Sequence, residues 1–190
     1  EEEEAEEEEE GPEYDEHVWL SLKNAKVLCN SIAQALAEID SEHANVYYAN
    51  EQSYNEKLDE LDQKYQKTVK QSSVNTLLFG DRFPFRYLVD DYGLKYYAAF
   101  VGCSAETEAS FKTITFLAKK VDELGLKNVM TIEKSDHKIA KTIIKNTKTK
   151  KQKILTLDSM QSTTSSDVKK GTTYFSVMEK NLAVLKKALQ

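Results

Sequence analysis

Cysteine is scarce in this chain of 190 residues, which contains only Cys29 and Cys103. Two cysteines are too few for a disulfide framework, and their spacing is not that of a Cys-x-x-Cys zinc knuckle. Cys29 falls on the apolar stripe of an expected helix, which predicts a buried thiol, and Cys103 lies in an expected loop. The sequence therefore excludes a disulfide-stabilised scaffold and a cysteine-rich metal knuckle.

Long apolar runs are also missing. No run approaches the roughly 18 residues that indicate a membrane-spanning helix, and no signal peptide or lipidation motif is visible. Because the sequence opens on an acidic run without Met, we expect a processed or truncated form of a longer protein. The missing signals then say little about its location.

Catalytic motifs are absent from the sequence as well. There is no Gly-x-Ser-x-Gly elbow, no glycine-rich phosphate loop, and no Cys or Ser with an obvious His partner. We therefore expect a protein that is not an enzyme.

Charge is unevenly distributed along the chain. Residues 1–10 contain nine of the 32 acidic residues, which leaves 23 acidic against 26 basic residues elsewhere. This charge block, followed by Gly11-Pro12, predicts disorder over residues 1–13. The lysines between Lys138 and Lys153 have no aromatic residues among them, so a solvated surface is a better interpretation than a nucleic-acid-binding one.

Two helices are expected before residue 73. Ser21 can cap a helix over 21–39, along which apolar residues recur at helical spacing. Asp40 can cap a second helix over about 42–71, which has one narrow apolar stripe and otherwise polar faces. The first stripe comprises Ala25, Leu28, Ile32, Leu36 and Ile39, and the second comprises Tyr47, Tyr54, Leu58, Leu61, Tyr65 and Val69. At 1.5 Å per residue the second helix is about 45 Å long, which is enough to connect two bodies.

From residue 74 onward, short β-rich segments alternate with helical ones. Strands are expected at 74–79, 96–101, 128–132 and 154–157, and helices at 85–92, 106–124, 135–146 and 174–189, with Ser135 as a possible cap and Gly125 as a stop. Four β-then-α units predict an α/β fold in which a four-stranded parallel sheet has flanking helices and follows a long connecting helix.

A carboxylate follows each expected strand: Asp81, the pair Glu106 and Glu108, Glu133, and Asp158. Ligands bind beyond the carboxyl ends of parallel strands, and converging carboxylates suit a divalent cation. Helix capping is the competing explanation, and we favour it for Glu106 and Glu108. It explains Asp158 less well, because a long polar loop follows that residue.

Histidine is the other candidate ligand. His43 and His137 lie in the first turns of expected helices, where exposure without a ligand role is the simpler interpretation. His17 differs because it precedes a helix within Tyr14-Asp15-Glu16-His17-Val18-Trp19-Leu20. An imidazole beside a packed Trp can be a metal ligand, although the residues alone leave a structural role equally open.

Several stretches, in order, resemble the metal-binding solute-binding proteins of zinc and manganese ABC transporters. They are Asp15 to Ser21 with Lys23-Asn24-Ala25, Asp40 to Ala49, Phe85 to Leu88 with Asp91 to Leu94, Ser104 to Glu108, Leu157-Asp158, and Tyr174 to Leu189. The resemblance covers nearly everything from residue 14 onward and indicates a divergent branch of that family.

The resemblance implies half of a two-lobe protein whose lobes are joined by one rigid helix. Residues 14–41 would end the first lobe, 42–72 would form the connecting helix, and 73–190 would form the C-terminal lobe. The implied metal ligands are His17, Asp158 and, in place of the usual third ligand, Asp81, together with a histidine further upstream. Arg82 aligns near that third ligand and cannot bind a cation, so Asp81 can equally be structural.

The implied function is extracytoplasmic capture of Zn²⁺ or Mn²⁺, with zinc preferred, and delivery to an ABC permease by a protein anchored to the membrane in its full-length form. The alternative is a surface interaction or adhesion module on the same fold with a decayed metal site. No nucleic-acid partner is expected. Because the apolar stripe of the long helix over 42–71 can be exposed without the first lobe, we also expect the chain to self-associate.

Overall fold

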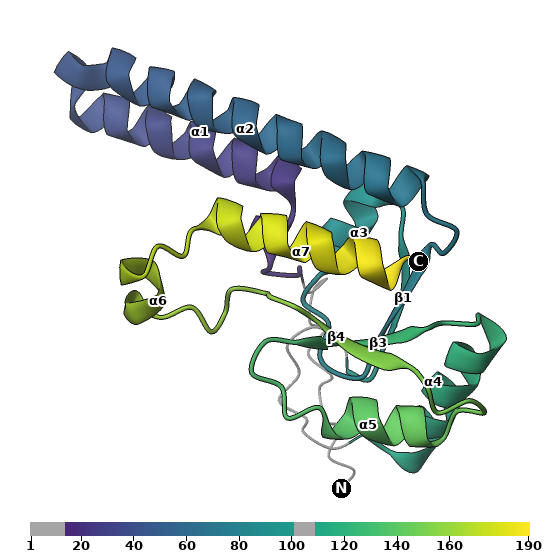
Figure 1. Cartoon of the computed structure of the whole chain (residues 1–190). Coiled ribbons are helices and arrows are strands. Elements are labelled where there is room, and N and C mark those ends of the chain that lie inside the picture. Colours follow the sequence, from purple (N-terminus) through teal and green to yellow (C-terminus); the bar gives the residue numbers. More distant parts are fainter. Residues whose placement is uncertain (1–13, 101–108) are drawn as a thin grey trace, which may run out of the picture.

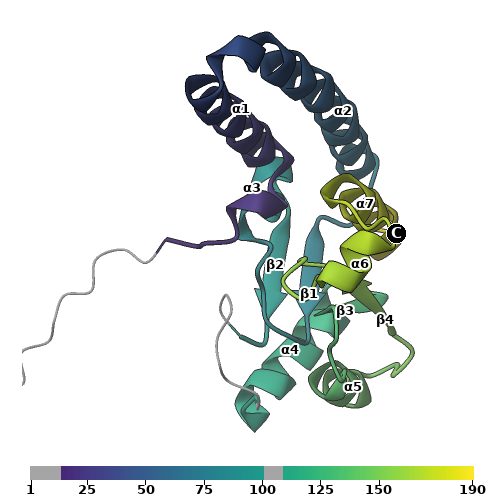
Figure 2. The same cartoon turned by 90° about the vertical axis from the view of Figure 1, so that its left-hand side faces the viewer.

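The computed structural model describes residues 14–100 and 109–190. Within these residues a four-stranded parallel sheet has helices on both faces, and a hairpin of two long helices projects from one side (Figure 1; Figure 2). The predicted disorder of residues 1–13 and the roles considered for Cys103, Glu106 and Glu108 fall outside the described residues.

The sheet has the strand order β2-β1-β3-β4, and every neighbouring pair is parallel. The strands are β1 (Thr76–Phe79), β2 (Lys95–Ala98), β3 (Asn128–Ile132) and β4 (Lys153–Leu157). Helix α3 (Arg86–Tyr92) follows β1, α4 (Phe111–Glu123) follows β2, α5 (Lys138–Lys145) follows β3, and α6 (Ser165–Lys169) and α7 (Tyr174–Ala188) follow β4. The α/β class and its four β-then-α units are confirmed, and among the described helices that follow strands the short α6 was not expected.

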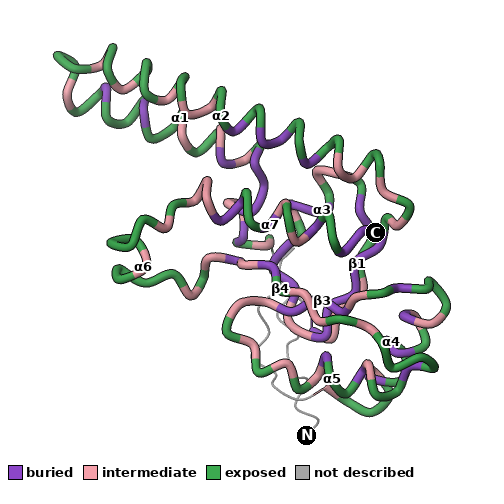
Figure 3. Tube along the Cα trace, in the orientation of Figure 1, coloured by how far each residue is buried: buried purple, intermediate pink, exposed green. Residues whose placement is uncertain are grey.

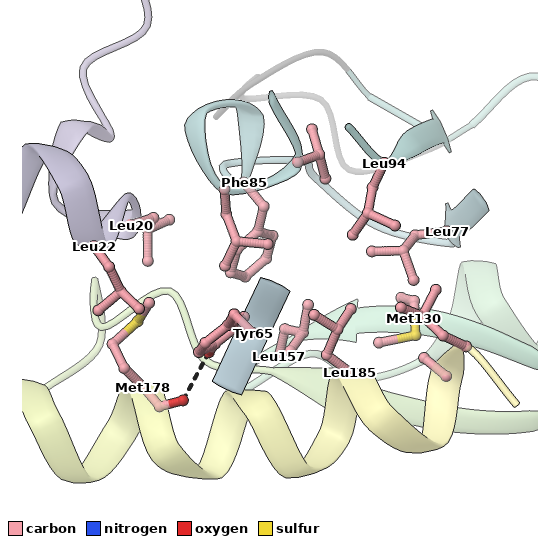
Figure 4. Close-up of a cluster of buried hydrophobic side chains, with 14 of the residues drawn as sticks. Leu20, Leu22, Tyr65, Leu77, Phe85, Leu94, Met130, Leu157, Met178 and Leu185 are labelled. Carbon is pink, nitrogen blue, oxygen red and sulfur yellow. Dashed lines mark hydrogen bonds between the residues drawn. The ribbon is translucent and has the colours of Figure 1, made fainter. Parts of the chain in front are cut away.

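Each face of the sheet packs against its own set of helices, because side chains alternate along a strand. On one face, Leu77 and Phe79 of β1 join a core with α2, α3 and α7. Figure 4 shows this core, in which the Tyr65 hydroxyl donates to the Met178 carbonyl at 2.7 Å. On the other face, Leu78 and residues of β3 pack against α4 and α5. The result is a three-layer arrangement of helices, sheet and helices. The side of the sheet at which the parallel strands end is its carboxyl edge.

The helical hairpin consists of α1 (Leu22–Ile39), a short turn η2 (Ser41–His43) and α2 (Ala44–Lys70). Both helices lie close to their expected ranges. The expected stripe of α2 is largely confirmed, because Leu58, Leu61 and Tyr65 are fully buried. Exposed and half-buried positions prevail along the outer part of the hairpin (Figure 3).

Of the expected apolar stripe of α1, only Ala25 is buried, and the four larger residues do not form the packed face. Ile32 is 59% exposed and Ile39 is 85% exposed, and Leu28 and Leu36 are also exposed. Helix α1 instead packs through a neighbouring row of mostly small side chains, namely Leu22, Ala25, Ala33 and Ala37. Small residues allow two helix backbones to approach closely, so alanines and not the larger residues face α2.

Two expected helix caps are corrected. Ser21 caps α1 as predicted, since its side chain accepts a hydrogen bond from the Asn24 N–H. Asp40 makes no side-chain cap, because its carboxylate accepts hydrogen bonds from His43 Nδ1 and the Tyr47 hydroxyl instead. Ser135 was expected to cap α5, but the N-cap residue is His137, whose backbone is left-handed with a φ of 60°.

Two expected boundaries are also corrected. The strand predicted at 96–101 is β2, which ends at Ala98, and the helix predicted from 106 is α4, which starts at Phe111 after its cap Ser110. None of the helices among the described residues has the length and apolarity that crossing a membrane requires.

Candidate metal centre

Three of the carboxylates predicted at strand ends come to one edge, because β1, β3 and β4 are adjacent in the sheet. Asp81 follows β1 after Gly80. Its Oδ1 accepts the N–H of Arg82 at 2.9 Å, and its Oδ2 accepts the N–H of Ile132 at 3.3 Å. Asp81 therefore ties the end of β1 to the end of β3.

Glu133, which follows β3, is held by the loop beyond β4. Its two carboxylate oxygens accept the Ser159 N–H at 2.8 Å, the Ser159 hydroxyl at 2.7 Å and the Ser162 N–H at 3.3 Å. Ser159 is fully buried and directly follows Asp158 in the chain. Glu133 thus fixes the course of the loop that carries Asp158.

The backbone of Asp158 is held by a side chain of α7. The Asp158 N–H donates to Asn181 Oδ1 at 2.9 Å, and its carbonyl accepts from Asn181 Nδ2 at 2.8 Å. Asp158 Oδ1 accepts the Met160 N–H at 2.8 Å. Burial raises the pKa of Asp158 above its ordinary value, the negative charge of Glu133 acts in the same direction, and the Met160 N–H opposes them. A cation at this position would relieve the cost of keeping Asp158 ionised.

His17 lies just before the short turn η1 (Val18–Leu20), and it is only 1% exposed. Its Nδ1 is 2.8 Å from Asp15 Oδ1, and its backbone N–H donates to the same oxygen at 2.9 Å. The imidazole ring lies 5.3 Å from the Trp19 ring, with the two planes tilted by 59°. His17 is therefore buried and oriented by a carboxylate, as metal-binding histidines commonly are.

The segment around His17 is attached to the loop around Asp158. Trp19 Nε1 donates to the Ser159 carbonyl at 3.0 Å, and the Tyr174 hydroxyl at the start of α7 donates to the Trp19 carbonyl at 2.7 Å. The two residues of the first contact are 140 positions apart in the sequence, and those of the second are 155 positions apart. Two segments that carry predicted ligands are therefore held next to each other.

The three predicted ligands are nevertheless not preassembled into one tight cluster. Among the described residues, the one group of three or more metal-ligating side chains whose ligand atoms lie within 4.8 Å of one another is Asp15, Glu16 and His17. Asp81 lies instead in a cavity of about 340 Å³ at the carboxyl edge, which Arg82 and Glu133 also line.

The donor set fits a divalent transition metal. One imidazole and several carboxylates are ligands that zinc accepts, and manganese tolerates them as well. Of the other histidines, His43 binds Asp40 at the exposed turn of the hairpin. Two residues with clear roles, Asn181 and Asp15, were not singled out from the sequence. The one signal for Asp15 was its position two residues before His17.

Comparison with known proteins defines the family of the chain. It matches the family described as zinc-uptake complex component A, periplasmic (ZnuA), over residues 1–188, and so belongs to it. The zinc-binding lipoprotein AdcA of Streptococcus pneumoniae is 33% identical over 174 residues, which are 92% of this chain and 34% of that protein. The chain thus spans about a third of the length of the curated relatives it matches.

Two solved structures are similar along almost the whole chain. A Zn(II)-bound mutant variant of AdcAII of Streptococcus pneumoniae has a TM-score of 0.78 and 29% identity, over 97% of this chain and 64% of that one. The laminin-binding protein Lmb of Streptococcus agalactiae, described as bifunctional with adhesin and metal-transporting activity, has a TM-score of 0.80 and 25% identity, over 93% and 65%.

These similarities confirm the resemblance drawn from the sequence. The family consists of metal-binding solute-binding proteins and not of enzymes. The family description and the curated relatives name zinc, in agreement with the preference for zinc over manganese. The α/β fold is that of the zinc-binding two-lobe proteins.

Proposed function

We propose that this chain captures Zn²⁺ outside the cytoplasm for delivery to an ABC permease. The observation that carries the proposal is the placement of His17. It is buried, its ring is oriented by Asp15, and its segment is joined to the Asp158 loop through the Trp19–Ser159 hydrogen bond. In the proposal, His17 and Asp158 are zinc ligands on the carboxyl edge of the sheet, residues 73–190 form one lobe, and α2 is the connecting helix.

The test is a calorimetric zinc titration of the whole chain and of His17→Ala and Asp158→Ala. Each ligand variant should lose at least tenfold in affinity, or about 1.4 kcal/mol. His43→Ala is the matched control, because His43 also contacts an aspartate but lies exposed on the hairpin. Binding that is equally strong in all four proteins would refute the assignment of these ligands.

We propose Asp81 as a third ligand, and its competing structural role is tested separately. Its carboxylate already accepts the N–H groups of Arg82 and Ile132. If Asp81 is a ligand, Asp81→Asn lowers zinc affinity. If Asp81 only ties β1 to β3, the same substitution lowers stability and leaves zinc affinity as it was.

Delivery to a permease and anchoring to the membrane are the further parts of this proposal. The periplasmic description of the family supports a location outside the cytoplasm, and the lipoprotein AdcA supports an anchored full-length form. The zinc-loaded full-length protein should stimulate ATP hydrolysis by its cognate permease in membranes. No stimulation by a protein that binds zinc would refute the delivery step.

An adhesion module is the second candidate, and the similarity to Lmb favours it. Lmb is described as both an adhesin and a metal transporter, so zinc binding alone does not exclude adhesion. Immobilised laminin is the probe. Saturable binding of the chain that persists in His17→Ala would support adhesion that does not depend on the metal, and no binding would refute this candidate.

Self-association is proposed from the outer face of α1. Leu28, Ile32, Leu36 and Ile39 are exposed on that helix and recur at helical spacing. A contiguous apolar face of this kind is typical of surfaces that contact another protein. Light scattering at increasing concentration should show species larger than the monomer, and a monomer at every concentration would refute the proposal.

A further inference from the structure

The carboxylate of Asp15 makes a paired contact with His17. One oxygen, Oδ1, lies 2.8 Å from His17 Nδ1 and also accepts the backbone N–H of His17 at 2.9 Å. The His17 side chain is 2% exposed and that of Asp15 is 20% exposed. The contact is therefore shielded from water, which strengthens it relative to an exposed Asp–His pair.

Elementary chemistry assigns the proton in this contact. An ionised carboxylate only accepts hydrogen bonds, so the ring nitrogen that faces it must carry a hydrogen. A neutral imidazole has one N–H and one lone pair. If Nδ1 carries the hydrogen, the lone pair of His17 is on Nε2, on the side of the ring away from Asp15.

Asp15 is itself held in place from another part of the fold. The Tyr87 hydroxyl, on α3, donates to the Asp15 carbonyl at 2.9 Å. On the other side, the His17 ring packs against Trp19, whose indole N–H is bound to the loop after β4. The orientation of the ring is thus determined by two elements of the C-terminal α/β body, and not only by its own short segment.

We propose that Asp15 is a positioning residue that fixes His17 as the Nδ1–H tautomer and so presents Nε2 as the zinc ligand. The inference rests on the proposed function, in which His17 binds the cation. A carboxylate that orients a metal-binding histidine in this way also raises the basicity of the ligand, and its loss typically lowers metal affinity about 10–100-fold.

The competing possibility is that Asp15 is itself a ligand. Asp15, Glu16 and His17 lie close enough for one ion to touch all three. Such an ion would lie on the Asp15 side of the ring, and it would have to displace the Nδ1–H contact. The two possibilities therefore predict zinc on different nitrogens of His17.

The first experiment reads the tautomer without zinc. The whole chain is labelled with ¹⁵N in histidine, and the two ring nitrogens are assigned by long-range proton–nitrogen NMR. His17 is expected as the Nδ1–H tautomer. In Asp15→Asn, whose amide can both donate and accept, the signals should shift toward a mixture of tautomers. Asp40→Asn is the matched control, because Asp40 contacts Nδ1 of the exposed His43.

The second experiment adds zinc. Asp15→Asn should lower zinc affinity about 10–100-fold, Asp15→Glu should restore part of the loss, and Asp40→Asn should leave affinity unchanged. In the zinc-bound wild-type chain, the nitrogen shift that changes most should be that of Nε2. Zinc on Nδ1, an Nε2–H tautomer in the wild-type chain, or an unchanged affinity in Asp15→Asn would each overturn the inference.

The two experiments separate the inference from the proposed function. If neither this chain nor the longer protein with the upstream histidine binds zinc, the proposed function fails, whereas the tautomer measured without zinc still tests the role of Asp15. If Asp15→Asn fails to fold, the tautomer and the zinc-bound nitrogen of the wild-type chain decide the question alone.

Discussion

Asn181 is expected to be a strong determinant of both stability and zinc binding. Its side chain is 1% exposed and makes two hydrogen bonds to the backbone of Asp158, one to the N–H and one to the carbonyl. In Asn181→Ala, both backbone groups of the partly buried Asp158 lose their partners. Each buried polar group left unpaired costs about 1–3 kcal/mol.

The expected loss follows from these contacts. Two fully buried unpaired groups would cost about 2–6 kcal/mol together. The lower part of that range, about 2–4 kcal/mol, applies here because Asp158 is only partly buried. Ala is favoured over Asn within a helix by roughly 0.5 kcal/mol. The free energy of unfolding of Asn181→Ala should therefore fall by about 1.5–3.5 kcal/mol. Zinc affinity should fall as well, because the Asp158 loop loses its attachment to α7.

Asn50→Ala is the matched control. Asn50 lies on an exposed part of α2, so the substitution has the same helix preference and breaks no buried contact. Its stability should change by no more than about 0.5 kcal/mol. Both variants are measured by urea unfolding followed by circular dichroism. If Asn181→Ala loses less than about 0.5 kcal/mol relative to Asn50→Ala, the reasoning about this contact is refuted.

Three further predictions concern the core, the rim and the hairpin. Tyr65→Phe should lower the free energy of unfolding by about 0.5–1.5 kcal/mol in urea, because the buried hydrogen bond from the Tyr65 hydroxyl to the Met178 carbonyl is lost; a change near zero would contradict this. Asp158→Asn should raise the free energy of unfolding at neutral pH while it weakens zinc binding. The reason is that burial and the Glu133 charge raise the folded-state pKa of Asp158, so its ionisation opposes folding above that pKa. The higher stability of Asp158→Asn relative to the wild-type chain should disappear as the pH falls through the raised pKa of Asp158. Lower stability of the variant at neutral pH would refute the argument. Ile32→Glu should reduce self-association in light scattering with a stability change within about 0.5 kcal/mol, since Ile32 is 59% exposed; unchanged association would place the contact elsewhere.

The strand ends show how far the sequence alone could predict the site. The positions of Asp81 and Asp158 after expected strands were enough to place them at one edge, because parallel strands share their direction. The expected order of ligands along the chain also came from the sequence. Neither the strand-end positions nor the order of the ligands predicted that Asp81 accepts a hydrogen bond from the Ile132 N–H or that Glu133 holds the loop after Asp158. Those contacts join neighbouring strands, and only the order of the sheet decides which strands are neighbours.

The α1 helix shows where the sequence was misleading. Its apolar stripe at helical spacing correctly predicted a helix, and its large side chains suggested the packed face. The structure packs the alanine face and leaves Ile32 and Ile39 exposed. Hydrophobic spacing reports the period of a helix, whereas the face that is buried depends on how closely the partner helix can approach.

The alternation of strands and helices, the α/β class, the family and the candidate ligands could all be predicted from the sequence. Periodicity, helix stops and the order of short stretches are local properties, so they can be read without coordinates. The environment of those ligands depends on contacts between distant parts of the chain. Asn181 reaches Asp158 across 23 residues, and Trp19 reaches Ser159 across 140. Such contacts depend on how distant elements pack together, and no local pattern in the sequence specifies that packing.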